Sequence, residues 1–178
     1  PSGLVNTLAM EGDADGEENN QACLSTSGTL KFSKEVAVQP GTGSTFDVVY
    51  TVSVINEGSL TAATGPINDA PSFAPGLTPT AVKVQRETER TRTVTPQADG
   101  SYRLSDNENL SPGTRIRYTV TFTVNIDPSA AGYGEDLLSC TAHNGRLVAG
   151  HGLYNKVVPE AGKDSDTRPD HDAACANV

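Results

Sequence analysis

The feature that most constrains this chain is a strict alternation of apolar and polar residues along three long segments, 29–38, 46–55 and 115–126. In the last of them, apolar residues from Ile116 to Ile126 occupy every second position, and arginine, threonine or asparagine fills the positions between them. Successive side chains of a β-strand point to opposite faces of its sheet. A period of two over this length therefore predicts strands that bury one face on a core.

Four shorter segments are also predicted strands: Ala81–Gln85, Thr91–Thr95, Ser101–Leu104 and Leu153–Val158. Turn-forming pairs such as Asp99-Gly100 separate the segments. No stretch of the sequence shows sustained helical periodicity. Seven or more short antiparallel strands joined by such turns predict an all-β fold, an immunoglobulin-like antiparallel β-sandwich.

The composition excludes several classes of function. Acidic residues outnumber basic ones by 22 to 13, giving a formal charge of −9. Phosphate binding requires clustered Lys and Arg, so we expect no nucleic-acid partner. Aromatic residues make up 5% of the chain and tryptophan is absent, which argues against a large aromatic-lined ligand pocket. No apolar run is long enough to span a bilayer, so we expect no membrane contact by this fragment.

The two ends of the chain resemble each other. Residues 3–6 read Gly-Leu-Val-Asn and residues 152–155 read Gly-Leu-Tyr-Asn, and each is followed by an acidic stretch and an Ala-Cys pair. Such an echo indicates a tandem array of domains. Residues 1–23 are then predicted to be the tail of a preceding repeat or a linker, and residues 24–178 a single repeat with an acidic C-terminal linker from about residue 160. The alternative is a chance similarity of two low-complexity ends.

Three polar residues interrupt the apolar faces. Lys34 is in phase with the apolar positions of its strand, Asp69 is in phase with Ile67, and Asn155 is in phase with Leu153. Lysine is rarely buried without a partner. The pattern therefore predicts a Lys, an Asp and an Asn that point into one core; the alternative is a lysine that reaches the solvent along its stem and two polar side chains satisfied at strand ends.

A chemical reaction is available to such a trio. Burial lowers the pKa of a lysine and leaves a neutral, nucleophilic amine. A carboxylic acid kept protonated by the same burial polarises the asparagine carbonyl and shuttles the proton. Attack of the amine expels ammonia and leaves an amide cross-link, in a single turnover of the protein on itself.

The motifs around these residues resemble those of the fimbrial isopeptide-forming domains of Gram-positive pilins and adhesins. The similarity lies in Leu-x-Phe-x-Lys-x-Val at residues 30–36, Ile-x-Asp at 67–69 before Pro-Gly-Leu at 75–77, and Gly-Leu-Tyr-Asn at 152–155. Residues 50–58 also resemble the conserved-repeat modules of surface stalks. The resemblance implies a Lys34–Asn155 bond with Asp69 as its catalyst. This sequence departs from the usual pattern of the family, because it has extra residues between Asp69 and the Gly-Leu pair. Glu57 and Asp127 are alternative candidates for the catalytic acid.

The three cysteines are an odd number. In an exported protein this count predicts one disulfide and one remaining thiol. The pair is either Cys140–Cys175 or Cys23–Cys140, and the repeat hypothesis favours the first because it assigns Cys23 to the preceding unit. No CxxC pair supports a zinc site.

Two acidic segments are weak calcium candidates. One contains Asp13 and Asp15, and the other contains Asp164 and Asp166. Asp-x-Asp-Gly begins a calcium loop, but neither segment completes an EF-hand. The alternative is a solvated linker. No other cofactor is predicted.

We therefore predict a structural stalk or spacer module of a bacterial surface adhesin or pilus protein. It would be extracellular, with its export signal and anchor outside this fragment, and neighbouring repeats of the same chain would be its partners. The alternative is an adhesin module that binds a host protein or glycan through residues 127–151. A hydrolase is disfavoured: Ser139 and His143 are close in sequence, but no Gly-x-Ser-x-Gly or His-Glu-x-x-His motif is present.

Overall fold

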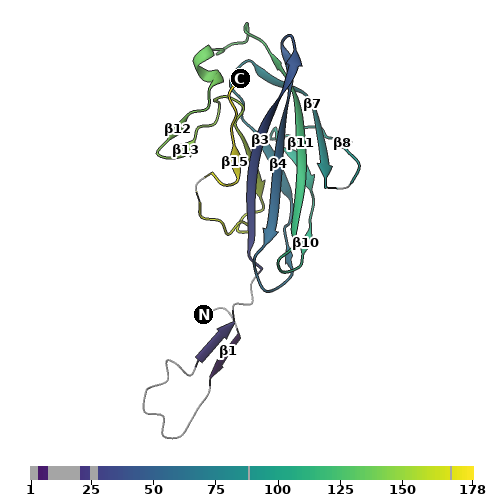
Figure 1. The fold of residues 1–178 in the computed structure, drawn as a ribbon, viewed down its shortest axis with the longest axis vertical. Helices are drawn as coiled ribbons and strands as arrows, with labels where there is room; N and C mark the ends of the chain where they lie inside the picture. The colour runs from purple at the N-terminus through teal and green to yellow at the C-terminus, as the bar shows by residue number, and fades with distance from the viewer. Residues whose placement is uncertain (1–3, 8–20, 25–27, 88, 169) are drawn as a thin grey trace.

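The computed structural model describes residues 4–7, 21–24, 28–87, 89–168 and 170–178. Nearly all of its regular structure is β-strand, which confirms the predicted all-β class (Figure 1). The elements are β1 (Leu4–Thr7), β2 (Gln21–Leu24), β3 (Leu30–Thr42), β4 (Thr45–Asn56), β5 (Ala62–Ala63), β6 (Ile67–Pro71), β7 (Leu77–Arg86), β8 (Arg92–Thr93), β9 (Tyr102–Ser105), β10 (Asn109–Leu110), β11 (Arg115–Ile126), η2 (Glu135–Leu138), β12 (Ala142–His143), β13 (Arg146–Leu147), β14 (Asn155–Pro159) and β15 (Ala173–Ala174).

Two antiparallel sheets form the sandwich. The first has the strand order β3-β4-β11-β7-β8, and the second has the order β15-β14-β6-β9. The three long alternating segments of the sequence become β3, β4 and β11, which pair side by side in the first sheet. Residues of both sheets share one apolar core. The core lies between the inner faces of the two sheets, as the alternation predicts.

The period of two holds along β4, an interior strand of the first sheet. In β4, Val48, Tyr50, Val52 and Val54 are fully buried, and the residues between them are less buried. Phe122 of β11 lies edge-on to Tyr102 of the opposite sheet, with 5.4 Å between ring centroids. Aromatic contacts across the sandwich add to the stabilisation from apolar burial.

The C-terminal residues differ from the predicted linker. Residues 164–168 and 170–176, here called the C-terminal strap, lie along β3 and β14. The strap forms a parallel bridge from Asp164 to Leu30, and Ala173–Ala174 pair with the first two residues of β14. Ala173 and Ala174 are buried. The strap is acidic, but its backbone and these two alanines complete the sandwich, so this part of the chain is not a solvated linker.

The first strands form a separate ladder. β1 and β2 pair antiparallel with Leu4 opposite Leu24, and among the described residues they form a two-stranded sheet of their own. The proposed origin of residues 1–23 as the tail of a preceding repeat stays a prediction.

Replacement of Phe122 by alanine tests the assignment of the core. Phe122 is fully buried and contacts Tyr50, Phe73 and Tyr102, so Phe122→Ala leaves a cavity that should cost about 3–5 kcal/mol of unfolding free energy. Thr119→Ala, on the exposed face of the same strand, is the matched control and should stay within about 0.5 kcal/mol. Denaturant unfolding measures both variants, and equal losses would contradict the assignment of the two faces.

Candidate functional site

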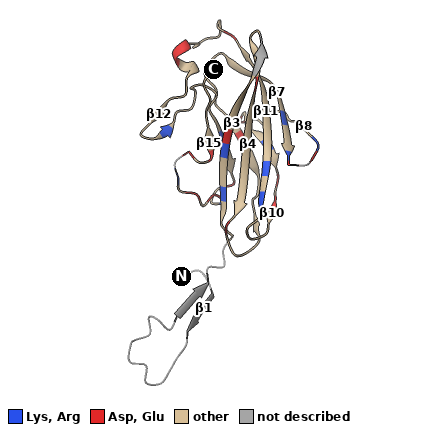
Figure 2. Ribbon diagram, viewed as in Figure 1, with Lys and Arg blue, Asp and Glu red and all other residues tan. Residues whose placement is uncertain are grey.

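Lys34 points into the core from an edge strand. Basic and acidic positions both occur along β3 (Figure 2). Glu35 of this strand is exposed, while the side chain of Lys34, its neighbour in sequence, is fully buried. Its Nζ lies 4.9 Å from the centroid of the Tyr50 ring. Burial lowers the pKa of Lys34 below 10.5, although the negative charges of Asp69 and Asp172 oppose this shift.

Asp69 reaches Lys34 from the opposite sheet. It lies on β6, between β14 and β9, and is fully buried. One carboxyl oxygen, Oδ1, contacts Nζ of Lys34. The other, Oδ2, accepts a hydrogen bond of 2.8 Å from Nδ2 of Asn155. A single carboxyl group therefore bridges an amine and an amide that belong to different sheets.

Asn155 is the first residue of β14 and is also fully buried. Pairing of β14 with β6 sets Asn155 opposite Pro71 and Val157 opposite Asp69, which brings the amide within reach of the carboxyl group. Among the described residues, Oδ1 of Asn155 is one of two buried side-chain polar atoms without a hydrogen-bond partner. An unpaired buried carbonyl is costly, so its presence here needs an explanation beyond packing.

Tyr50 of β4 contacts both Lys34 and the residues just before β14. Its hydroxyl donates a hydrogen bond of 2.5 Å to the carbonyl of Leu153, two residues before Asn155. Burial raises the pKa of Tyr50 well above its usual value, so the hydroxyl stays protonated and remains a donor. The ring of Tyr50 also packs against Phe73 and Phe122. The site is thus an apolar region of the core that encloses three polar side chains, those of Lys34, Asp69 and Asn155.

The two alternative acids lie elsewhere. Glu57 forms an ion pair with Lys31 at 2.5 Å, with both side chains partly exposed. Asp127 accepts hydrogen bonds from the backbone and hydroxyl of Ser129 in an exposed turn. Of the candidate acids, the structure brings only Asp69 to Lys34 and Asn155.

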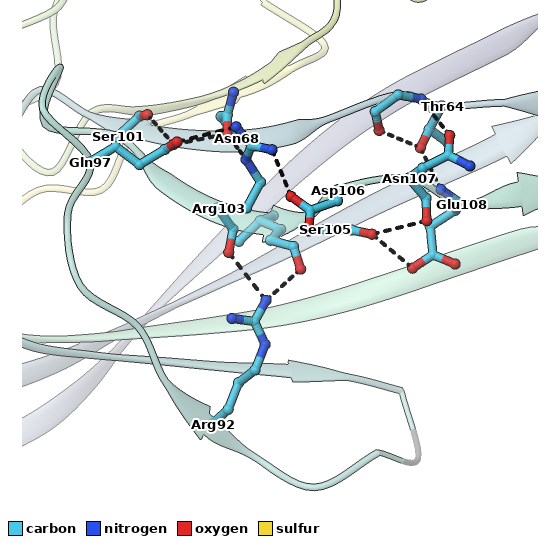
Figure 3. A network of polar contacts seen from close by, with 12 residues as sticks. Thr64, Asn68, Arg92, Gln97, Ser101, Arg103, Ser105, Asp106, Asn107 and Glu108 are labelled. Carbon is cyan, nitrogen blue, oxygen red and sulfur yellow. Dashed lines mark hydrogen bonds and ion pairs between the residues drawn. The ribbon is translucent and has the colours of Figure 1, made fainter.

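A polar network that the sequence pattern did not predict surrounds Asn68 of β6 (Figure 3). Oδ1 of Asn68, next to Asp69, accepts hydrogen bonds from Nε of Arg103 at 2.7 Å and from Nε2 of Gln97 at 3.0 Å. Arg92 in turn donates to the carbonyl of Leu104 at 2.5 Å. These bonds tie β9 to β6 and to β8, so they support the strand that carries Asp69. The partners of Asn68 lie 29 and 35 positions further along the chain, and the residues share no periodicity that could have indicated the network.

The disulfide joins Cys140 to Cys175, with 5.9 Å between the Cα atoms. This is one of the two pairings that the sequence left open; the Cys23–Cys140 pairing is not the one formed. Cys23 lies on β2, where only the backbone is described. Gly152 packs against the bond, because a Cβ at this position would lie 3.1 Å from each sulfur and 2.7 Å from the carbonyl oxygen of Ala176.

The two calcium candidates that the structure describes, Asp164 and Asp166, accept hydrogen bonds from the protein itself. Asp13 and Asp15 lie outside the described residues. Asp166 accepts hydrogen bonds from Arg168 and pairs with His171 at 2.5 Å, and Arg168 lowers the pKa of its carboxyl group. Asp164 accepts the backbone N–H of Asp166. Within the described part of the chain, no group of three or more His, Cys, Asp or Glu residues could hold a metal ion.

Comparisons with known proteins return no relative: no family model, no curated protein and no solved structure matches this chain. In the described residues, no helix is long and apolar enough to cross a membrane.

Titration of thiols tests the cysteine pairing. One disulfide and three cysteines leave one free thiol, so the denatured, unreduced protein should react with one thiol reagent per chain, and the Cys23→Ser variant with none. Closing this loop, with a sequence separation of 35, should stabilise the protein by about 3–4 kcal/mol, and reduction should remove that amount. A Cys23→Ser variant with two reactive thiols would contradict the pairing.

Proposed function

We propose that this chain is an extracellular stalk or spacer module of a bacterial adhesin or pilus protein, stabilised by an autocatalytic isopeptide bond between Lys34 and Asn155. The observation that carries the proposal is the carboxyl group of Asp69, which contacts both the amine and the amide inside an apolar core. A buried Lys–Asp pair is rarely a gain in stability over apolar residues, which favours a chemical role for it.

The reaction follows from these contacts. In a core of low dielectric, transfer of one proton from Lys34 to Asp69 converts an ion pair into a neutral amine and a neutral acid. The amine attacks Cγ of Asn155, the Nζ–Cγ bond forms and the Cγ–Nδ2 bond breaks. Oδ1 of Asp69 accepts the proton that Nζ loses, and Oδ2 delivers a proton to Nδ2. Ammonia leaves, an amide joins the two side chains, and no oxidant or cofactor is consumed.

The position of this bond suits a module under tension. β3 begins near the lower end of the sandwich in Figure 1, and the C-terminus lies near the upper end. A bond between Lys34 and Asn155 would carry tension from one end to the other and would bypass residues 35–154. It would also close a loop of about 120 residues, which the chain-entropy model values at about 5 kcal/mol.

The alternative, a ligand-binding module, has less support. Its predicted site, residues 127–151, contains η2 and the β12–β13 hairpin. The exposed large hydrophobic residues of the described chain are Val38, Leu60, Val158 and Val178, which all lie outside this stretch. Nothing in the described part of the stretch specifically favours a ligand, so we propose the stalk.

The mass of the intact, reduced protein tests the cross-link. We expect a deficit of one ammonia relative to the mass calculated from the sequence, and a branched peptide that joins Lys34 to Asn155. Lys34→Ala, Asn155→Ala and Asp69→Ala should each restore the calculated mass, because each removes the nucleophile, the electrophile or the proton shuttle.

Lys31→Ala is the matched control, since Lys31 lies on the same strand with a partly exposed side chain. This variant should keep the deficit. A wild-type protein with the full calculated mass, or a Lys34→Ala variant that keeps the deficit, would overturn the proposal.

The pH dependence of stability tests the burial of the amine. In Asn155→Ala, which cannot cross-link, Lys34 should keep a pKa below its unfolded value of 10.5. Between the two pKa values the unfolded state binds more protons, so the unfolding free energy should rise with pH and level off near 10.5. The rise is about 1.4 kcal/mol for each unit by which the two pKa values differ.

A second variant isolates the lysine. Asn155→Ala combined with Lys34→Met should lack this rise, and so should the cross-linked wild type, whose amide does not titrate. Denaturant unfolding between pH 6 and about 10.5 measures all three proteins. Parallel curves for Asn155→Ala and the double variant would contradict a neutral amine in the folded state.

A further inference from the structure

The reactive site lies at an open side of the sandwich. β3 is the edge strand of the first sheet, and β14 is next to the edge of the second sheet, where β15 is only two residues long. A core position on an edge strand has a neighbouring strand on one side only. Lys34 and Asn155 therefore need a further segment to exclude water from this side.

The C-terminal strap is that segment. The backbone N–H of Lys34 donates to the carbonyl of His171 at 3.0 Å, and the N–H of Val157 donates to Asp172 at 2.8 Å. Asn155 pairs with Ala174 in the β14–β15 ladder. The strap thus bonds to both edges of the sandwich, and it bonds directly to the backbone of the two residues that would react.

The strap is attached by hydrogen bonds, an ion pair and a disulfide. Its ladder with β14 covers two residues on each strand, which is too short to be stable without other contacts. Those contacts include the N–H of Ser165, which donates to the carbonyl of Leu30 at 2.8 Å, and an ion pair of 3.2 Å between Asp172 and Lys156. Near its far end, the carbonyl of Ala176 accepts a hydrogen bond of 2.8 Å from Leu153, and Cys175 is bonded to Cys140. The disulfide is the covalent attachment that keeps the strap over the site.

We propose that formation of the Cys140–Cys175 disulfide precedes the Lys34–Asn155 cross-link and controls its rate by closing the strap over the reactive site. The proposal rests on the proposed function. The two thiols lose two protons and two electrons to a disulfide donor, by thiol–disulfide exchange. The cross-linking step that follows is redox-neutral and releases ammonia.

The physical link between the two steps is the access of water to Lys34. Desolvation is the largest influence on the pKa of its amine, so an open strap returns this pKa towards 10.5 and reduces the neutral, nucleophilic fraction. The groups that face Lys34 are Asp69 from β6, Tyr50 from β4 and Asp172 from the strap. The charge of Asp172 acts in the opposite direction to burial, and it is the last of the influences on this pKa in order of size. The cross-link would therefore form after export, where thiols are oxidised.

The order of the two reactions is measured directly by mass. The full chain is synthesised with an excess of reductant and then divided between a buffer with glutathione disulfide and a buffer with reductant, and intact mass is followed over time. We expect the oxidised sample to lose two hydrogens first and ammonia second. The reduced sample should lose ammonia about tenfold more slowly for each unit by which the pKa of Lys34 rises.

The outcomes separate this inference from the proposed function. Equal rates of ammonia loss in both buffers would overturn the order of reactions and leave the cross-link standing. An oxidised sample that never loses ammonia would overturn both. Cys140→Ser and Cys175→Ser should behave as the reduced sample does, and Cys23→Ser, the matched control, should cross-link as fast as the wild type.

A further measurement separates solvent access from unfolding. Amide exchange of β4 and β11 reports whether the sandwich of the reduced protein is folded. With the sandwich folded, a higher pH should restore the cross-linking rate of the reduced protein, because it regenerates the neutral amine of Lys34. A folded, reduced protein whose rate is slow and does not increase with pH would contradict control by the strap.

Discussion

The carboxyl group of Asp69 is the interaction on which the centre of this sandwich depends. It lies without solvent between the amine of Lys34 and the amide of Asn155, and it is the one described carboxyl group that touches either side chain. Without it, the core would hold a lysine with no partner, at a cost of several kcal/mol. With it, a proton can pass from the amine to the carboxyl group, so that the amine, the acid and the amide are all uncharged. This is also the state from which an amine can attack an amide.

The fold delivers these groups from separate directions. Lys34 comes from the first sheet, while Asp69 and Asn155 come from two neighbouring strands of the second, so the contact depends on how the sheets face each other as well as on the register of β6 and β14. Tyr50 and the network around Asn68 support the site from two sides. A shift of β14 by one residue would turn Asn155 to the opposite face of its sheet.

Much of this could be predicted from the sequence, because alternation is a local signal. It identified the long strands, and the phase of Lys34, Asp69 and Asn155 within their segments indicated that all three point inwards. The C-terminal strap could not be predicted in this way. Its acidic composition is typical of a solvated linker, and its place against β3 depends on backbone pairing between residues about 135 positions apart. The choice between two cysteine pairings likewise depended on long-range contacts that the spacing of Cys23, Cys140 and Cys175 does not contain.

The strap also determines when the site is complete. Asn155 follows the strands of the first sheet in the sequence, and the segment that covers Lys34 comes later still, so the site closes only after the strands of both sheets have been placed. An irreversible bond formed earlier would trap any misplaced strand within its loop. A site whose last wall is the C-terminal strap, attached by its own covalent bond, would restrict the proposed irreversible step to molecules whose two sheets have already folded. In this proposal, the exclusion of water that would make the amine of Lys34 nucleophilic occurs only when the fold is complete, so the cross-link would form only in folded molecules.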